Sequence, residues 1–208
     1  MRRRTSSRGG PAGVPIARRG LGAIVPAMVL SLFAFADTEA PSAATPRSAS
    51  SPQLFDQMFA VFEHPRCMNC HTGEAFPRQG DDSHRHTLNV MRGAADRGAA
   101  GLHCGTCHQS ANQTASGVPG ARDWQLAPTR MAWTGLNAGQ LCRALRDPSR
   151  GDMSPDRMLA HFSTGLVRWA WAPGTDAHHR ARATPPLTYS ELIGLTKHWI
   201  ASGAVCPD

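Results

Sequence analysis

The sequence contains the same five-residue pattern twice, once at Cys67–His71 and once at Cys104–His108. C-x-x-C-H is the attachment pattern of a c-type haem. The two cysteines bind one porphyrin covalently, and the histidine after the second cysteine is the proximal axial ligand of the iron. The sequence therefore predicts two covalently attached haem c groups, held by Cys67, Cys70 and His71 and by Cys104, Cys107 and His108.

A zinc ribbon is the main alternative, because two C-x-x-C pairs separated by 33 residues also suit four thiolates around one tetrahedral Zn²⁺. A ribbon has no need of His71 and His108, each placed directly after its second cysteine. The repeated histidine therefore favours haem.

The first 36 residues have the order of a secretory signal. They carry six Arg and no acidic residue, and an apolar run from Leu21 ends in Ala34-Phe35-Ala36. The run is shorter than the roughly 20 apolar residues of a membrane span and contains Pro26. We expect export to the periplasm with cleavage after Ala36 and no stable membrane span in the mature chain, although retention of the leader as an anchor stays open.

The basic charge of the chain belongs largely to this leader. The whole sequence has 22 basic and 15 acidic residues, and removal of residues 1–36 leaves 16 basic residues against 15 acidic ones. Haem propionates would add negative charge. A nucleic-acid partner therefore has no electrostatic support.

Composition divides the rest of the chain in two. Residues 37–52 are small, polar and Pro-rich and are expected to form a flexible tether. Residues 53–208 are expected to form one dihaem cytochrome c domain, mainly α, compact, with short helices and long loops around the haems. Helices are expected over 53–63, after Asn137, after Ser154 and after a Ser190 cap, with loops at 72–86 and 111–130.

The spacing of the two motifs decides how they are arranged. The 33 residues between Cys70 and Cys104 are too few for a complete single-haem fold, which needs on the order of 80 residues. We therefore expect both haems in one unit, close enough for their irons to be electronically coupled.

The sixth iron ligands are less well determined, because no fixed spacing identifies them. His86 and His161 are the leading distal candidates, and an ordinary structural histidine is a serious competitor for each. Met91 and Met131 are the alternatives. The choice matters because a Met/His pair raises the haem potential relative to two histidines.

Cys142 and Cys206 are left over from the haem count. In an oxidising compartment, two unassigned cysteines most simply form a disulfide, and the alternative is two buried thiols.

Several segments together resemble small bacterial dihaem cytochromes described as the cytochrome subunit of isoquinoline 1-oxidoreductase type enzymes. The likeness is carried by His64–His71, Gln79–Asp82, His86, Asn89–Gly93, Cys104–Gln109, Leu141-Cys142, His161, Trp169–Gly174 and Ala204–Pro207. It covers nearly all of the mature chain, although Thr72 stands where the pattern has Pro and Gly151-Asp152 replaces Asn-Gly-Gly. The resemblance implies an electron-transfer partner of a molybdenum hydroxylase.

Two functions follow as expectations. The first is an electron carrier without enzymatic turnover, since no paired carboxylates or free catalytic cysteine stand beside a base. Its partners would be redox donor and acceptor proteins. The second is a dihaem peroxidase-like enzyme in which one iron keeps an open position.

Overall fold

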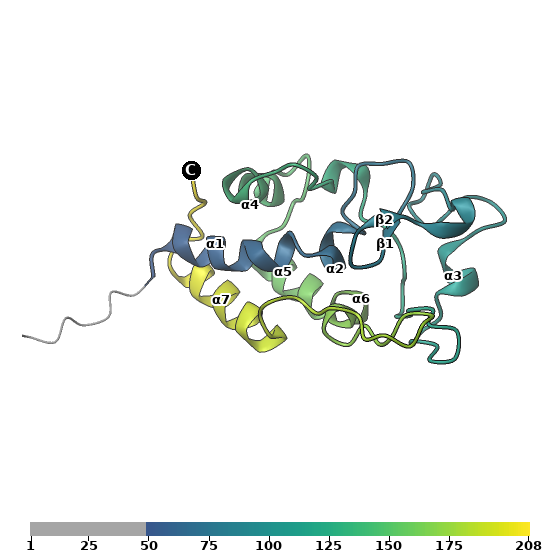
Figure 1. The fold of residues 1–208 in the computed structure, drawn as a ribbon. Coiled ribbons are helices and arrows are strands. Elements are labelled where there is room, and N and C mark those ends of the chain that lie inside the picture. Colours follow the sequence, from purple (N-terminus) through teal and green to yellow (C-terminus); the bar gives the residue numbers. More distant parts are fainter. Residues whose placement is uncertain (1–48) are drawn as a thin grey trace, which may run out of the picture. The chain divides into compact units, whose positions relative to one another are not determined.

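The computed structural model describes residues 49–208, which form one compact unit, and the predicted signal at 1–36 and most of the tether lie outside the described residues. Helices are the main regular structure, as expected, and long loops join them (Figure 1). The elements are α1 (Ser51–Phe62), α2 (Pro65–Met68), β1 (Arg78–Gln79), β2 (His84–Arg85), η1 (Thr87–Asn89), α3 (Cys104–Cys107), η2 (Thr129–Met131), α4 (Ala138–Arg146), α5 (Pro155–Phe162), α6 (Gly165–Arg168), η3 (Trp169–Trp171) and α7 (Tyr189–Ala201).

The first helix begins two residues before the predicted domain boundary at 53. Ser50 lies at its N-cap, and its backbone N–H donates to Gln53 Oε1 at 2.9 Å. Pro52 fits the first turn, where a backbone N–H has no partner within the helix. Residues 51 and 52 are therefore helical and do not belong to a flexible tether.

The hydrophobic core lies where α1 packs against α7, side by side in Figure 1. Phe55 is fully buried and its ring centroid lies 5.4 Å from that of Trp199. Phe62, at the other end of α1, contacts Trp133 edge-on with centroids 5.7 Å apart. Each such aromatic side chain contributes roughly 1.5–3 kcal/mol of burial free energy, which makes α1 the element around which the unit is assembled.

Helix α4 begins where the sequence predicts. The Asn137 side chain accepts from Gln140 N–H at 2.8 Å, and Gln140 Oε1 accepts from Asn137 N–H at 2.9 Å. This reciprocal pair satisfies two backbone donors at the helix start. Cys142 of α4 forms a disulfide with Cys206, which confirms the predicted pairing and fastens the C-terminal segment to the helix.

For α5 and α7, one predicted N-cap is confirmed and the other is wrong. Ser154 accepts from Arg157 N–H at 3.3 Å, as predicted for α5. Helix α7 is capped by Thr188, whose hydroxyl accepts from Glu191 N–H at 3.2 Å while Glu191 Oε2 accepts from Thr188 N–H at 2.7 Å. The Ser190 cap is therefore wrong, because the T-x-x-E pattern at Thr188 starts the helix earlier.

The loops contain little regular structure, with one difference from the prediction. Within 72–86, β1 pairs with β2 as an antiparallel hairpin. Gly80 has a φ of +79° and Ser83 a φ of +54°, which allows the chain to reverse over four residues. Two-residue strands are too short to show sequence alternation, which is why the sequence does not reveal them.

A buried arginine joins the loops that follow the two motifs. Arg92 is 7% exposed, and it donates to the backbone oxygens of Thr72, at 2.5 Å, and Ala127, at 2.6 Å. Its charge is balanced by Asp96 at 2.6 Å. A guanidinium with several fixed donors can hold irregular backbone in place where no sheet or helix does so. Within residues 49–208, no helix is long and apolar enough to cross a membrane.

Replacing Cys142 and Cys206 together by Ser should lower the free energy of unfolding by about 4 kcal/mol, because the crosslink closes a long loop in the unfolded chain. The bond spans a sequence separation of 64 residues. Guanidinium unfolding of the holoprotein measures the loss. Peptide mapping after alkylation without reduction should find neither thiol labelled in the parent protein, and labelling of both would contradict the bond.

Replacing Thr188 by Ala should lower the free energy of unfolding by about 1 kcal/mol, because the start of α7 loses its capping hydroxyl. Ser190→Ala is the matched control on the same helix turn and should change it by less than about 0.5 kcal/mol. Chemical unfolding of both variants decides between the caps, and a larger loss for Ser190→Ala would contradict the assignment to Thr188.

Candidate functional site

The first C-x-x-C-H motif is presented by a single helical turn. His64 starts α2, and its Nδ1 accepts from Arg66 N–H at 3.2 Å. The turn continues past the end of α2, since His71 N–H donates to Cys67 O at 3.1 Å. Neither Cys67 nor Cys70 is in a disulfide. This turn therefore offers two thiols and an imidazole from adjacent positions.

His71 is fixed from two sides. Its Nδ1 lies 3.0 Å from Met131 O, and its ring stacks on the Trp133 indole with centroids 3.5 Å apart and an interplanar angle of 14°. Because a carbonyl can only accept, Nδ1 carries the proton and the lone pair is left on Nε2. Burial lowers the pKa of His71 to about 3, the Met131 hydrogen bond opposes this, and nearby His161 adds to the lowering. His71 is thus neutral, the state that an axial metal ligand requires.

The second motif repeats this arrangement with different residues. His108 follows α3, its Nδ1 donates to Pro119 O at 2.7 Å, and Trp124 stacks on its ring with centroids 4.4 Å apart and an interplanar angle of 5°. Burial lowers the pKa of His108 as well, and His86 and Arg182 contribute to the lowering. Each motif histidine is therefore held by one backbone carbonyl and one indole. A carbonyl that accepts from the far ring nitrogen is the usual orienting contact of a metal-bound histidine.

The sequence predicted the histidines and missed their supports. Met131 and Pro119 contribute through backbone oxygens, which leave no trace in a sequence. Trp133 and Trp124 belong to the five tryptophans that all follow the second motif. That clustering was the one available signal, and it does not say which indole meets which histidine.

The structure brings His86 to the second motif. The His86 and His108 ring centroids lie 6.0 Å apart at an interplanar angle of 77°. His86 Nδ1 lies 2.7 Å from Thr87 O, so its Nε2 is also free to accept. Two imidazoles that bind one iron through Nε2 have centroids about 6 Å apart, since a metal–nitrogen bond is about 2 Å long. His86 and His108 are therefore near enough for both imidazoles to hold one haem iron if it were bound here.

His161 lies near the first motif. It is on α5, burial lowers its pKa, and it contributes to the lowered pKa of His71. The two distal candidates are therefore divided between the motifs, one to each. Met131 lies behind His71, where its carbonyl meets Nδ1, and its side chain belongs to the hydrophobic core. Met91 Sδ lies 3.6 Å from a guanidinium nitrogen of Arg85. Both methionine side chains thus have other contacts, with the core and with Arg85, which favours the histidine pair.

The two motifs belong to the same compact unit. Burial raises the pKa of the Cys67 thiol to about 12, with contributions from Cys70, and raises the pKa of Cys70 to about 11 with a contribution from Cys104. A cysteine of the first motif is therefore close enough to one of the second to affect its ionisation. This agrees with the expectation that both groups share one unit. Among residues 49–208, no group of three or more His, Cys, Asp or Glu side chains is placed to hold a bare metal ion.

The surroundings of the two motifs differ. Cys67, Met68 and Trp133 pack against or belong to the hydrophobic core. The second motif is more open, since Cys107 is exposed. Two large apolar side chains are exposed close to it, Leu88 at 73% and Leu102 at 42%. The first site is thus the less exposed of the two, since Cys67 and Cys70 are half-buried and Cys107 is exposed.

A hydrogen-bond donor beside His71 has no partner. Trp133 Nε1 is buried and has no acceptor among the described residues. A buried donor without a partner costs about 1–3 kcal/mol. A haem bound at the first motif would bring carboxylate acceptors into this region, so the orphaned donor fits the predicted group.

The chain was also compared with known proteins. No protein-family model, no curated protein and no solved structure matches it. The assignment of a function therefore depends on the geometry of the site and on the motifs.

Replacing His86 by Ala should convert one of the two haems from low to high spin, because the second iron loses its sixth ligand while His108 keeps its place. His161→Ala should do the same to the other haem, and the double variant should convert both. Magnetic circular dichroism of the purified holoproteins measures how many haems are high-spin. His198→Ala, which removes an exposed histidine, is the control. Unchanged spectra for both single variants would contradict the distal assignment and favour Met91 or Met131.

Proposed function

We propose that this chain is an exported dihaem c-type cytochrome that relays single electrons between redox proteins in the periplasm. When bound, each haem supplies an iron that changes oxidation state by one electron. The observation that carries the proposal is the matched support of His71 and His108, each donating from Nδ1 to a carbonyl and stacked on an indole. Different residues of the segment between α3 and α4 provide the same contacts at both motifs.

The surrounding residues suit a carrier. Each motif histidine has a second histidine near it, so both irons can be six-coordinate, and ligand rearrangement on electron transfer is then small. Two histidines also give a lower potential than a Met/His pair. Both motifs lie in one compact unit, which suits transfer between the two groups.

The open second site suits contact with a partner. Leu88 and Leu102, close in the chain to His86 and Cys104, offer exposed apolar surface, and Arg97 and Arg122 lie with His108 around one hollow. A redox protein that docks there would meet apolar and positively charged surface. The resemblance to dihaem subunits supports a molybdenum-containing hydroxylase as the electron donor and the respiratory chain as the acceptor. A mature charge near neutrality predicts association rates that depend only modestly on salt.

Intact mass spectrometry of protein purified from the periplasm should give the processed polypeptide plus two haems. Cys104→Ser/Cys107→Ser should carry one, which controls for non-covalent haem. A parent mass equal to the bare polypeptide would overturn the dihaem proposal. It would favour the alternative in which the two C-x-x-C pairs bind zinc.

Rapid mixing of the oxidised holoprotein with a reduced donor should reduce both hemes, and carbon monoxide should bind the reduced protein weakly, because neither iron has an open position. Peroxide consumption should stay at the level of free haem. Fast peroxide turnover together with tight carbon monoxide binding would replace the carrier by a peroxidase-like enzyme.

A further inference from the structure

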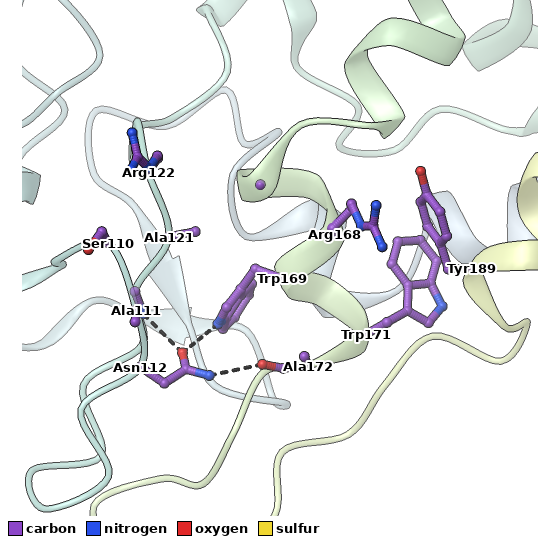
Figure 2. Close-up of a pocket in the computed structure, with 12 residues that line it drawn as sticks. Ser110, Ala111, Asn112, Ala121, Arg122, Arg168, Trp169, Trp171, Ala172 and Tyr189 are labelled. Atoms are coloured by element: carbon purple, nitrogen blue, oxygen red, sulfur yellow. Dashed lines mark hydrogen bonds between the residues drawn. The ribbon is translucent and has the colours of Figure 1, made fainter.

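A cavity of about 590 Å³ lies between the loop that follows the second motif and the α6–η3 segment (Figure 2). One wall is formed by Asn112 and Arg122 and the other by Arg168, Trp169 and Tyr189. Its volume is in the range of roughly 300–1,000 Å³ typical of small-molecule sites. The function proposed above makes no use of it.

None of the four histidines expected to bind iron, His71, His86, His108 and His161, lines the cavity. A second hollow adjoins it, because Ser110, Ala121 and Arg122 line both, and this second hollow is also lined by His108 and Trp124. Trp169, which lines the cavity, lies edge-on to Trp124 at 4.8 Å, and Trp124 stacks on His108. A molecule in the cavity would therefore contact Trp169 and lie beside the second motif without touching its histidine.

The walls are held rigidly. Asn112 Oδ1 accepts from Trp169 Nε1 at 2.8 Å and Asn112 Nδ2 donates to Ala172 O at 2.9 Å, so one amide joins the loop to η3, as Figure 2 shows. On the other side, the Arg168 guanidinium lies over the Tyr189 ring at 4.9 Å. Since these side chains are fixed by their neighbours, little ordering is needed when a ligand binds.

The lining has the chemistry of a site for an aromatic anion. Trp169, Trp171 and Tyr189 supply aromatic surface, and Arg122 and Arg168 supply positive charge. No acidic residue lines the cavity, and neither arginine has an ion pair among residues 49–208. A guanidinium pairs well with a planar carboxylate, and aromatic walls favour a flat apolar body.

We propose that this cavity binds a small planar aromatic carboxylate, with its ring against Trp169 and its carboxylate toward Arg168. No cysteine or histidine of either motif lines the cavity, and binding there goes beyond electron relay.

Gly165 provides a direct test. It lines the cavity, and a Cβ built there meets no atom within 4 Å, so a larger side chain can enter the open space without backbone strain. Gly194 in α7 has equally open surroundings and lies outside the cavity lining, which makes Gly194→Leu the matched control for Gly165→Leu.

Calorimetric titration of the holoprotein with 2-naphthoate should show saturable binding, and the neutral 2-naphthamide should bind about tenfold more weakly. Gly165→Leu should abolish naphthoate binding and Arg168→Gln should weaken it about tenfold, while Gly194→Leu and the exposed Arg157→Gln should leave it unchanged. Far-UV circular dichroism and haem content confirm that each variant is folded.

Three results would overturn the proposal. They are an absence of naphthoate binding, binding that persists in Gly165→Leu, and equal affinity for the acid and the amide. A fourth contradicting result is a change in the Soret band when naphthoate is added. A ligand that displaces an axial histidine would cause such a change, and the molecule would then be bound at an iron and not in the cavity.

Discussion

The arrangement of the candidate site depends on one kind of hydrogen bond, from histidine Nδ1 to a backbone carbonyl. Met131 provides the acceptor for His71 and Pro119 the acceptor for His108. Each bond fixes the tautomer and the direction of Nε2, and it ties a motif to a later loop, 60 residues after His71 and 11 residues after His108. Because a carbonyl has to be brought to the ring, the paths of the loops around residues 119 and 131 are set by this requirement. The long irregular segments of the fold are thus part of the site.

Local patterns determined which parts could be predicted from the sequence. Helices α1, α4 and α5 followed from apolar spacing and from Asn137 and Ser154, whose effects act within one turn. The cap of α7 was misplaced because Thr188 and Ser190 are both plausible and only Thr188 has Glu191 three residues later. The partners of His71 and His108 could not be predicted, since a backbone carbonyl can come from any residue. The pairing of His86 with the second motif depends on the β1–β2 hairpin and Arg92, both tertiary features.

The contrast between the two motifs has consequences for the proposed relay. Burial of a charged group in a low-dielectric region disfavours the charged form, so an enclosed site beside Trp133 and an open site beside exposed Cys107 are expected to differ in potential. Such a difference gives electron transfer between them a direction. In the proposed relay, one partner would dock at the open second site, and the electron would pass between the two groups.

The aromatic side chains unite these features. Trp133 and Trp124 orient the two motif histidines, and Trp169 carries the contact outward from Trp124 to the cavity. Asn112, four residues after His108, holds Trp169 by its indole N–H. The same amide therefore fixes a ring that contacts the support of the second motif. The cavity wall and the support of His108 thus share one continuous set of aromatic contacts, from Trp169 through Trp124 to the imidazole.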